Sequence, residues 1–217
     1  MEKTVAHIGP ALLDGLTTTM AISLAALVLG APLALILAAA VRGGRWIRVP
    51  AGVYISFWRG TPILVQLLII FYILPFLALE LSPTMAAIVA LALNTAAFQS
   101  EIYRAGLQAI PQGEVEAAKM LGLPPHTIFM HIEVPQAFRS MLPALIGEMQ
   151  ALIKNSSLVS VIAVSDLTRR AQQVAASTFR PLEAYVSALI LYVTIGVLLA
   201  AVGLLLERRL SHGSEDQ

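Results

Sequence analysis

Residues 113–135 read GEVEAAKMLGLPPHTIFMHIEVP, a polar stretch that lies between long apolar runs and is too short to cross a bilayer. It predicts two short helices with a sharp turn between them. The first helix, expected over residues 114–121, contains good helix formers and has acids in its first turn, where the helix dipole favours them. Gly122 follows at the position of a C-terminal cap, where glycine adopts the left-handed conformation at little cost.

The second predicted helix of this stretch covers residues 126–132. Pro125 suits the first turn of a helix, and Pro135 is expected to end it. On the first helix, Ala117 and Ala118 leave a small, flat face that another protein could approach closely. We therefore interpret the stretch as a docking element, with an interfacial hairpin that only stabilises the fold as the alternative.

Composition places the chain in a membrane. Of its 217 residues, 58% are hydrophobic and 12% are charged, and the mean hydropathy is +0.80. Soluble domains carry about 25% charged residues. The net charge of +1 gives no indication of nucleic-acid binding, and the absence of cysteine removes disulfides and thiolate metal sites. The first apolar run is too long for a cleaved signal peptide, so we expect it to be retained as a span.

Apolar runs predict an all-α integral membrane protein with five transmembrane helices in one domain, residues 1–217. The expected spans are residues 15–41, 57–79, 84–108, 140–165 and 184–206. Each is long enough to cross a hydrocarbon core of about 30 Å. The fourth differs from the others because it carries Glu148 and Lys154.

Basic residues predict the orientation of these spans. If five spans alternate, one side holds Arg42, Arg45, Arg48, Arg59, Arg104, Lys119, Arg139, Arg208 and Arg209, and the other holds Lys3, Arg169, Arg170 and Arg180. Cytoplasmic loops carry the excess of Lys and Arg. The count favours an N-terminus outside, a cytoplasmic C-terminus and a cytoplasmic loop at residues 113–135, with the arginines of residues 169–180 as the exception.

Several motifs in the chain match one family. They are RGTP at residues 59–62 with LVQ at 64–66, NTAA at 94–97 with Glu101-x-x-Arg104, EAA at 116–118 with Gly122 and PQA at 135–137, and KNSSL at 154–158. The chain closely resembles the membrane permease subunits of bacterial ABC importers, in the group that takes up polar amino acids. It departs from the family's pattern at Asn155, where Asp is usual, and at Gly147-Glu148.

The resemblance implies a type I importer subunit in the bacterial cytoplasmic membrane, with an EAA coupling loop formed by Glu116, Ala117, Ala118 and Gly122. It also implies partners: two ATPase subunits, which would bind ATP and Mg, a second permease that is identical or a sister chain, an extracytoplasmic solute-binding protein and membrane lipid. The expected substrate is a polar amino acid or a close derivative. No cofactor is expected in this chain.

Glu148 is the main candidate for the substrate pathway because it lies near the predicted midplane of the fourth span. A charge there costs roughly 2.5–3.5 kcal/mol, so it must face the bundle interior or water. It could bind a substrate ammonium or guanidinium group, or it could instead pair with Arg104. Glu101 and Arg104 are spaced i,i+3, and we interpret them as a structural ion pair.

Further pathway candidates are uncharged. Asn94 lies mid-span in the third helix with Gln99 beyond it, and an amide there could bind a passing amino acid or bond a neighbouring helix. Met149 and Leu152 lie one turn around from Glu148 and could line an apolar part of the path, although such residues are more often plain packing.

The absence of several known motifs argues against other functions for this chain. No G-x-x-x-x-G-K-[ST] sequence is present, which argues against ATP binding through a P-loop, and no catalytic or metal-binding motif is present. The leading hypothesis is therefore a transporter subunit rather than an enzyme. The alternatives are an ion- or proton-coupled secondary carrier that uses Glu148 or Glu101, and an assembly subunit that does not transport.

Overall fold

A computed structural model of the chain describes residues 2–212, with side chains described for residues 9–209, so that Lys3 lies outside the described side chains. The described residues form helices and no strand. In chain order the elements are α1 (Glu2–Val41), α2 (Arg45–Gly60), α3 (Ile63–Ile73) with the 3-10 turn η1 (Leu74–Leu77), α4 (Pro83–Gln108), α5 (Gln112–Met120), α6 (Pro125–Ile128), the π-helical turn η2 (Phe129–Glu133), α7 (Val134–Ser156), the 3-10 turn η3 (Ser157–Ile162), α8 (Leu167–Thr178) and α9 (Pro181–His212).

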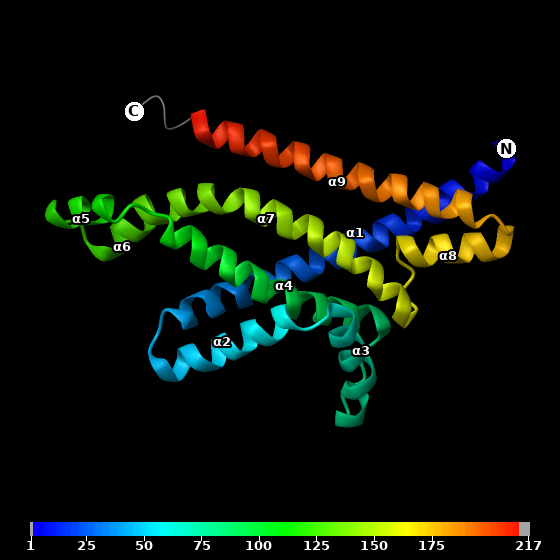
Figure 1. Cartoon of the computed structure of the whole chain (residues 1–217), viewed down its shortest axis with the longest axis horizontal. Helices are drawn as coiled ribbons and strands as arrows, with labels where there is room; N and C mark the ends of the chain where they lie inside the picture. The colour runs from blue at the N-terminus through cyan, green and yellow to red at the C-terminus, as the bar shows by residue number, and fades with distance from the viewer. Residues whose placement is uncertain (1, 213–217) are drawn as a thin grey trace.

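The long helices α1, α4, α7 and α9 lie roughly along the long axis of the molecule (Figure 1). The hairpin formed by α5 and α6 lies at one end, and the turn between α1 and α2 and the C-terminal end of α9 lie toward that same end. The N-terminal end of α1 and helix α8 lie at the opposite end. This arrangement is that of a chain that passes repeatedly between two faces of a membrane.

The described helices include three that are long and apolar enough to cross a membrane alone, namely α1, α4 and α9. The pairs α2–α3 and α7–α8 qualify only as bent spans, with angles of 107° and 51°, so the number of spans is three, or up to five if each bent pair is one span. The apolar window of α4 is 61% buried and that of α9 is 6% buried, so α4 is central and α9 is peripheral.

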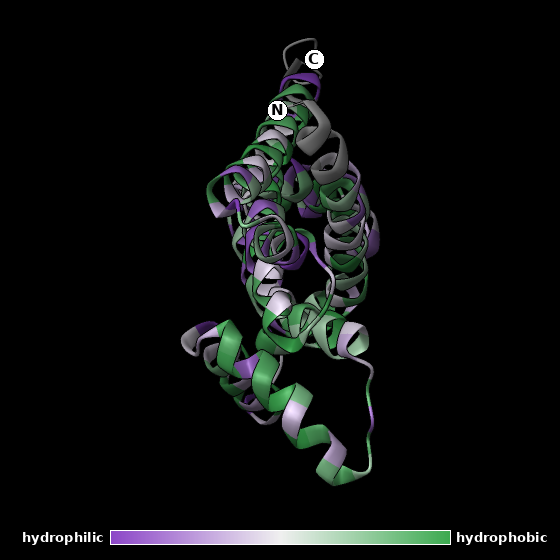
Figure 2. Cartoon of the chain, turned by 90° about the vertical axis from the view of Figure 1, so that its right-hand side faces the viewer, coloured by the Kyte–Doolittle hydropathy of each residue, from purple (hydrophilic) through white to green (hydrophobic). Residues whose placement is uncertain are grey.

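The span predicted over residues 57–79 is not one straight helix. Helix α2 already begins at Arg45, the chain bends after Gly60, and α3 begins at Ile63. Pro62 explains the break, because proline has no backbone N–H and its ring clashes with the preceding turn. Viewed along the long axis, α3 projects away from the bundle of long helices, and its residues are largely apolar (Figure 2).

The span predicted over residues 140–165 also differs. The helical backbone is continuous from Pro125 to Ile162, so the prediction that Pro135 ends a helix is wrong. The π-helical turn η2 lies immediately before α7, and the Val134 N–H bonds to the Phe129 carbonyl. The widened turn accommodates the proline, which needs no donor at the start of α7. At the other end, the α-helix changes to a 3-10 helix within the polar KNSS run, at Ser157.

Small residues bring α1 and α4 into close contact. The buried alanines of α4 are Ala86, Ala87, Ala90, Ala92, Ala96 and Ala97. Gly30 of α1 faces them, and a Cβ added at Gly30 would lie 2.8 Å from Thr95 Cγ2 and 2.9 Å from the Ala92 carbonyl oxygen. Helices pack this closely in membranes where small residues let the backbones approach.

Helix α8 was not predicted from the sequence, which indicated only a charged connection before the last span. Asp166 caps its N-terminus by accepting hydrogen bonds from the backbone N–H groups of Thr168 and Arg169. The Leu167 N–H donates to Thr19 Oγ1 at 3.1 Å, which fixes α8 to α1. Arg169 and Arg170, two of the arginines that depart from the predicted charge distribution, therefore belong to a helix packed against α1 and α9, and Arg180 lies in the connection to α9.

Candidate functional site

Glu148 of α7 faces the central helix α4. Thr95 Oγ1 donates a 2.8 Å hydrogen bond to Glu148 Oε1, and it accepts a 3.1 Å bond from Gln99 Nε2. The Tyr103 hydroxyl in turn donates to Gln99 Oε1 at 2.8 Å. Glu148 thus ends a chain of hydrogen bonds that follows one face of α4. The sequence singled out Glu148 and Gln99 but missed Thr95 and Tyr103, although the spacing of four between Thr95, Gln99 and Tyr103 was a visible signal.

The carboxylate of Glu148 has a neutral partner. The ion pairs among the described side chains are Arg59–Glu101, Arg104–Glu101, Arg170–Asp14 and Arg180–Glu183, so the alternative of a Glu148–Arg104 pair is not formed. Glu148 is half-buried, and the hydrogen bond from Thr95 uses one of its two oxygens. A carboxylate in this setting retains the ability to accept hydrogen bonds from a cationic group of a ligand.

Asn94 is a structural residue in this conformation. It is buried, and its Nδ2 donates to the Trp58 carbonyl at 3.1 Å and to Gln66 Oε1 at 2.9 Å. Gln66 Nε2 donates to the same carbonyl at 3.0 Å and to Thr61 Oγ1 at 2.6 Å. In an unbroken helix the Trp58 carbonyl would accept from residue 62, which is proline and has no N–H. The two amides therefore replace the lost donor and fasten the α2–α3 bend to α4.

The two apolar pathway candidates differ in exposure. Leu152 is 2% exposed and belongs to the largest core cluster, together with Leu67, Leu91 and Ile162. It is packed in the core of this structure, and its place in the substrate pathway stays a prediction. Met149 is half-buried beside Glu148 in the sequence and remains accessible.

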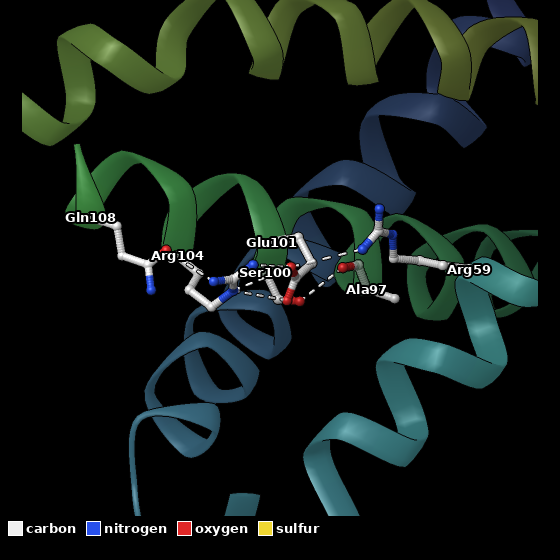
Figure 3. A network of polar contacts seen from close by, with 6 residues as sticks. All are labelled: Arg59, Ala97, Ser100, Glu101, Arg104 and Gln108. Carbon is white, nitrogen blue, oxygen red and sulfur yellow. Dashed lines mark hydrogen bonds and ion pairs between the residues drawn. The ribbon is translucent and has the colours of Figure 1, made fainter.

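Glu101 lies in an ionic network (Figure 3). Arg104 Nη2 lies 2.6 Å from Glu101 Oε2, which confirms the predicted i,i+3 pair, and Arg59 Nη1 lies 3.8 Å from the same oxygen. The guanidinium of Arg59 also lies 5.4 Å from the centre of the Phe98 ring, a cation–π contact. A hollow of about 500 Å³ between α4 and α7 borders this network. Glu101 is therefore engaged by two cations and joins α2 to α4.

The tip of the α5–α6 hairpin has the geometry of a Schellman cap. Gly122 has φ +76°, its N–H bonds to the Lys119 carbonyl at 3.0 Å, and the Leu123 N–H bonds to the Ala118 carbonyl at 3.2 Å. The left-handed backbone explains the glycine. Met120 and Leu121 beside it are 88% and 80% exposed. The tip therefore presents apolar side chains on a fixed turn.

Only part of the predicted EAA surface is exposed. Glu116 and Ala117 face outward, whereas Ala118 is 4% exposed and packs in a cluster with Val115, Ile128 and Ala137. The expectation that both alanines form one outer face is wrong, because α6 and the start of α7 cover the side of α5 that carries Ala118. Gln136 Nε2 donates to the Glu114 carboxylate and ties the two helices together. A groove of about 520 Å³ runs beside them, lined in part by Glu114, Ala117, Leu121, His131, Gln136 and Arg139.

Comparison with solved structures defines the class of protein. The chain superimposes on the crystal structure of an amino acid ABC transporter with histidines with a TM-score of 0.89 and 34% identity, covering 94% of this chain and 96% of the other. The MetNI methionine ABC transporter in an inward-facing conformation gives a TM-score of 0.75 at 19% identity, covering 97% and 99%, and this likeness concerns the fold alone. The fold is that of an ABC importer transmembrane subunit.

Sequence comparison gives the family. Residues 30–212 match the profile of the binding-protein-dependent transport system inner membrane component, and the chain belongs to this family. Similar proteins include the arginine transport system permease protein ArtQ of Bacillus subtilis, 39% identical with 93% of each chain covered. The L-cystine transport system permease protein TcyB of the same organism is 39% identical, with 93% of this chain and 87% of the relative covered. The protein is therefore a multi-pass inner membrane transport component.

Proposed function

We propose that this chain is the transmembrane subunit of an ATP-driven importer that carries a polar amino acid or a close derivative across the cytoplasmic membrane. The observation that carries the proposal is the α5–α6 hairpin, a capped helical tip at one end of a membrane fold with Met120 and Leu121 exposed on it. The names of the relatives, which transport arginine and cystine, support an amino acid as the substrate class.

In this proposal the hairpin transmits ATPase movement to the spans. Gly122 fixes the turn, Glu116 and Ala117 are the exposed members of the EAA motif, and α6 continues without a break into α7. A displacement applied at the tip therefore reaches the helix that carries Glu148. The partners are two ATPase subunits that bind ATP and Mg, a second permease, and a solute-binding protein on the opposite side.

The substrate path in this proposal passes Glu148 and Met149. The Glu148 carboxylate can still accept hydrogen bonds from an ammonium or guanidinium group of a substrate. In this proposal Asn94 and Gln99 do not line the path, because both side chains are buried and hydrogen-bonded within the fold. These amides hold α2, α3 and α4 around the path rather than contact the substrate.

Basic residues support a cytoplasmic location for the hairpin end. Arg42, Arg45 and Arg48 follow the α1–α2 connection at that end, and Lys119 and Arg139 belong to the hairpin and its exit. The excess of positive charge marks the cytoplasmic face. The N-terminus is then outside, and the C-terminus is cytoplasmic.

Gentle purification of the tagged chain from its own host's membranes tests the proposal. We expect a P-loop ATPase in stoichiometric amount, and its loss from the Gly122→Asp variant. Gly113→Ala is the matched control, because a Cβ at Gly113 meets nothing within 4 Å and the residue has no positive φ. A wild-type chain that purifies alone, under conditions where known transporter complexes survive, would contradict the proposal.

A further inference from the structure

Three arginines in the α1–α2 turn and the first turn of α2 have no side-chain partner among the described residues. Arg42, Arg45 and Arg48 are exposed, and none of their side chains makes a hydrogen bond or an ion pair with any described residue. The sequence contains no Asp or Glu between Asp14 and Glu80, so no carboxylate lies near these arginines along the chain. Their guanidinium groups are therefore open to an anionic group from outside the chain.

Helix α2 exposes apolar side chains within one turn of Arg45 and Arg48. Trp46 is 92% exposed, and the exposed side chains around and after it are Ile47, Val49, Val53 and Phe57. Arg45, Trp46, Val49 and Pro50 border an open hollow of about 730 Å³. A surface that changes from guanidinium groups to tryptophan and then to aliphatic side chains matches the change from headgroup to hydrocarbon at a membrane boundary.

The position of the α1–α2 turn agrees with this boundary. It lies toward the same end of the molecule as the α5–α6 hairpin, and the hairpin extends farther out along the long axis (Figure 1). The hairpin thus projects into water while the turn lies closer to the apolar part of the helices. A protein partner in the aqueous phase would also have to cover the apolar side chains of Val49, Val53 and Phe57. Lipid covers these side chains wherever α2 lies in the bilayer.

We propose that Arg42, Arg45 and Arg48 bind the phosphate groups of anionic phospholipids, with Trp46 inserted at the level of the headgroups. Arginine suits this ligand because its planar guanidinium donates paired hydrogen bonds to phosphate oxygens. A basic residue near a charged bilayer surface contributes about a fivefold preference for anionic lipid. We name these four residues the lipid patch. It is independent of the substrate and of the ATPase.

Tryptophan fluorescence measures which lipids lie beside the patch. The chain has two tryptophans, Trp46 and the buried Trp58, so the difference between wild type and Trp46→Phe isolates the signal of Trp46. The full chain is placed in bilayers that contain phosphatidylglycerol or phosphatidylcholine brominated on the acyl chains, at equal mole fraction. We expect brominated phosphatidylglycerol to show at least about a fivefold higher apparent affinity for the site that quenches Trp46.

Substitutions of the three arginines test whether the lipid preference depends on their charge. Replacing all three arginines by Gln should abolish the preference, and replacing all three by Lys should keep most of it, because lysine keeps the charge but not the paired hydrogen bonds. High salt should weaken the preference. If the Gln variant does not insert, the comparison of wild type with the Lys variant and the salt series remains informative.

Two results would overturn the inference. The first is equal quenching of Trp46 by both brominated lipids in the wild type at low salt. The second is protection of Trp46 from both lipids in the purified complex with its ATPase, which would assign the patch to a protein interface.

Discussion

Thr95 of α4 donates a 2.8 Å hydrogen bond to the carboxylate of Glu148 on α7, and the two residues are 53 positions apart in the chain. The bond joins the central helix to the helix that continues from the α5–α6 hairpin. Glu148 is therefore positioned by α4 and connected to the hairpin through its own helix. This relationship places the proposed substrate group on the element that the proposed ATPase would move.

Thr95→Val should destabilise the protein by about 1–2 kcal/mol, because it removes the donor to a half-buried carboxylate and the acceptor for Gln99. Thermal unfolding of the purified protein in detergent measures this. Thr194→Val is the control, since the Thr194 hydroxyl bonds only the Ile190 carbonyl on the exposed face of α9. Equal unfolding temperatures for both variants would show that the Thr95–Glu148 bond contributes nothing to stability.

Glu148→Gln should lower the uptake of cationic amino acids relative to neutral ones by about tenfold, because an amide oxygen is a weaker acceptor than a carboxylate for a charged donor. Competition between arginine and glutamine for uptake in cells measures this ratio. Glu80→Gln, in the exposed connection before α4, is the matched control. An unchanged ratio in Glu148→Gln would remove Glu148 from the substrate path.

Gln66 and Asn94 should be energetically coupled, since their side chains bond each other and share the Trp58 carbonyl. A double-mutant cycle of Gln66→Met and Asn94→Leu is expected to give a coupling energy of about 0.6–1.7 kcal/mol in unfolding free energy. Gln66→Met combined with Thr194→Val should be additive. Additivity within the Gln66–Asn94 cycle would argue that the α2–α3 bend is held by other contacts.

Gly30→Ala should destabilise the contact between α1 and α4. The new Cβ would lie 2.8 Å from Thr95 Cγ2 and 2.9 Å from the Ala92 carbonyl oxygen, and such overpacking costs about 1–3 kcal/mol. Gly52→Ala, where nothing lies within 4 Å, should leave the unfolding temperature unchanged or raise it. An unfolding temperature for Gly30→Ala equal to that of Gly52→Ala would contradict the close approach of the two helices.

Local features of the site were predictable from the sequence. Glu101 and Arg104 pair because one helical turn separates them, and Gly122 caps a helix because the turn needs a left-handed residue. Both follow from neighbours in the chain. The apolar runs likewise indicated the membrane helices, since hydrophobicity over about 20 residues is a local property.

Features that depend on packing between distant helices could not be predicted. Which alanine of the EAA motif faces outward depends on where α6 and α7 lie, and the structure buries Ala118 rather than Ala117. Asn94 reads equally well as a substrate ligand or a helix contact until Gln66 and the Trp58 carbonyl are placed beside it. The missing N–H of Pro62 was visible in the sequence, but the groups that compensate for it come from two other helices.

ATP-driven uptake in proteoliposomes tests the central claim most directly. The chain is reconstituted with its co-purified ATPase and the solute-binding protein, and labelled amino acid uptake is followed with ATP or with an imposed ion gradient. We expect uptake only with ATP, and its loss in Gly122→Asp but not in Gly113→Ala. Uptake driven by an ion gradient without ATP, or normal ATP-driven uptake by a well-inserted Gly122→Asp variant, would contradict the account.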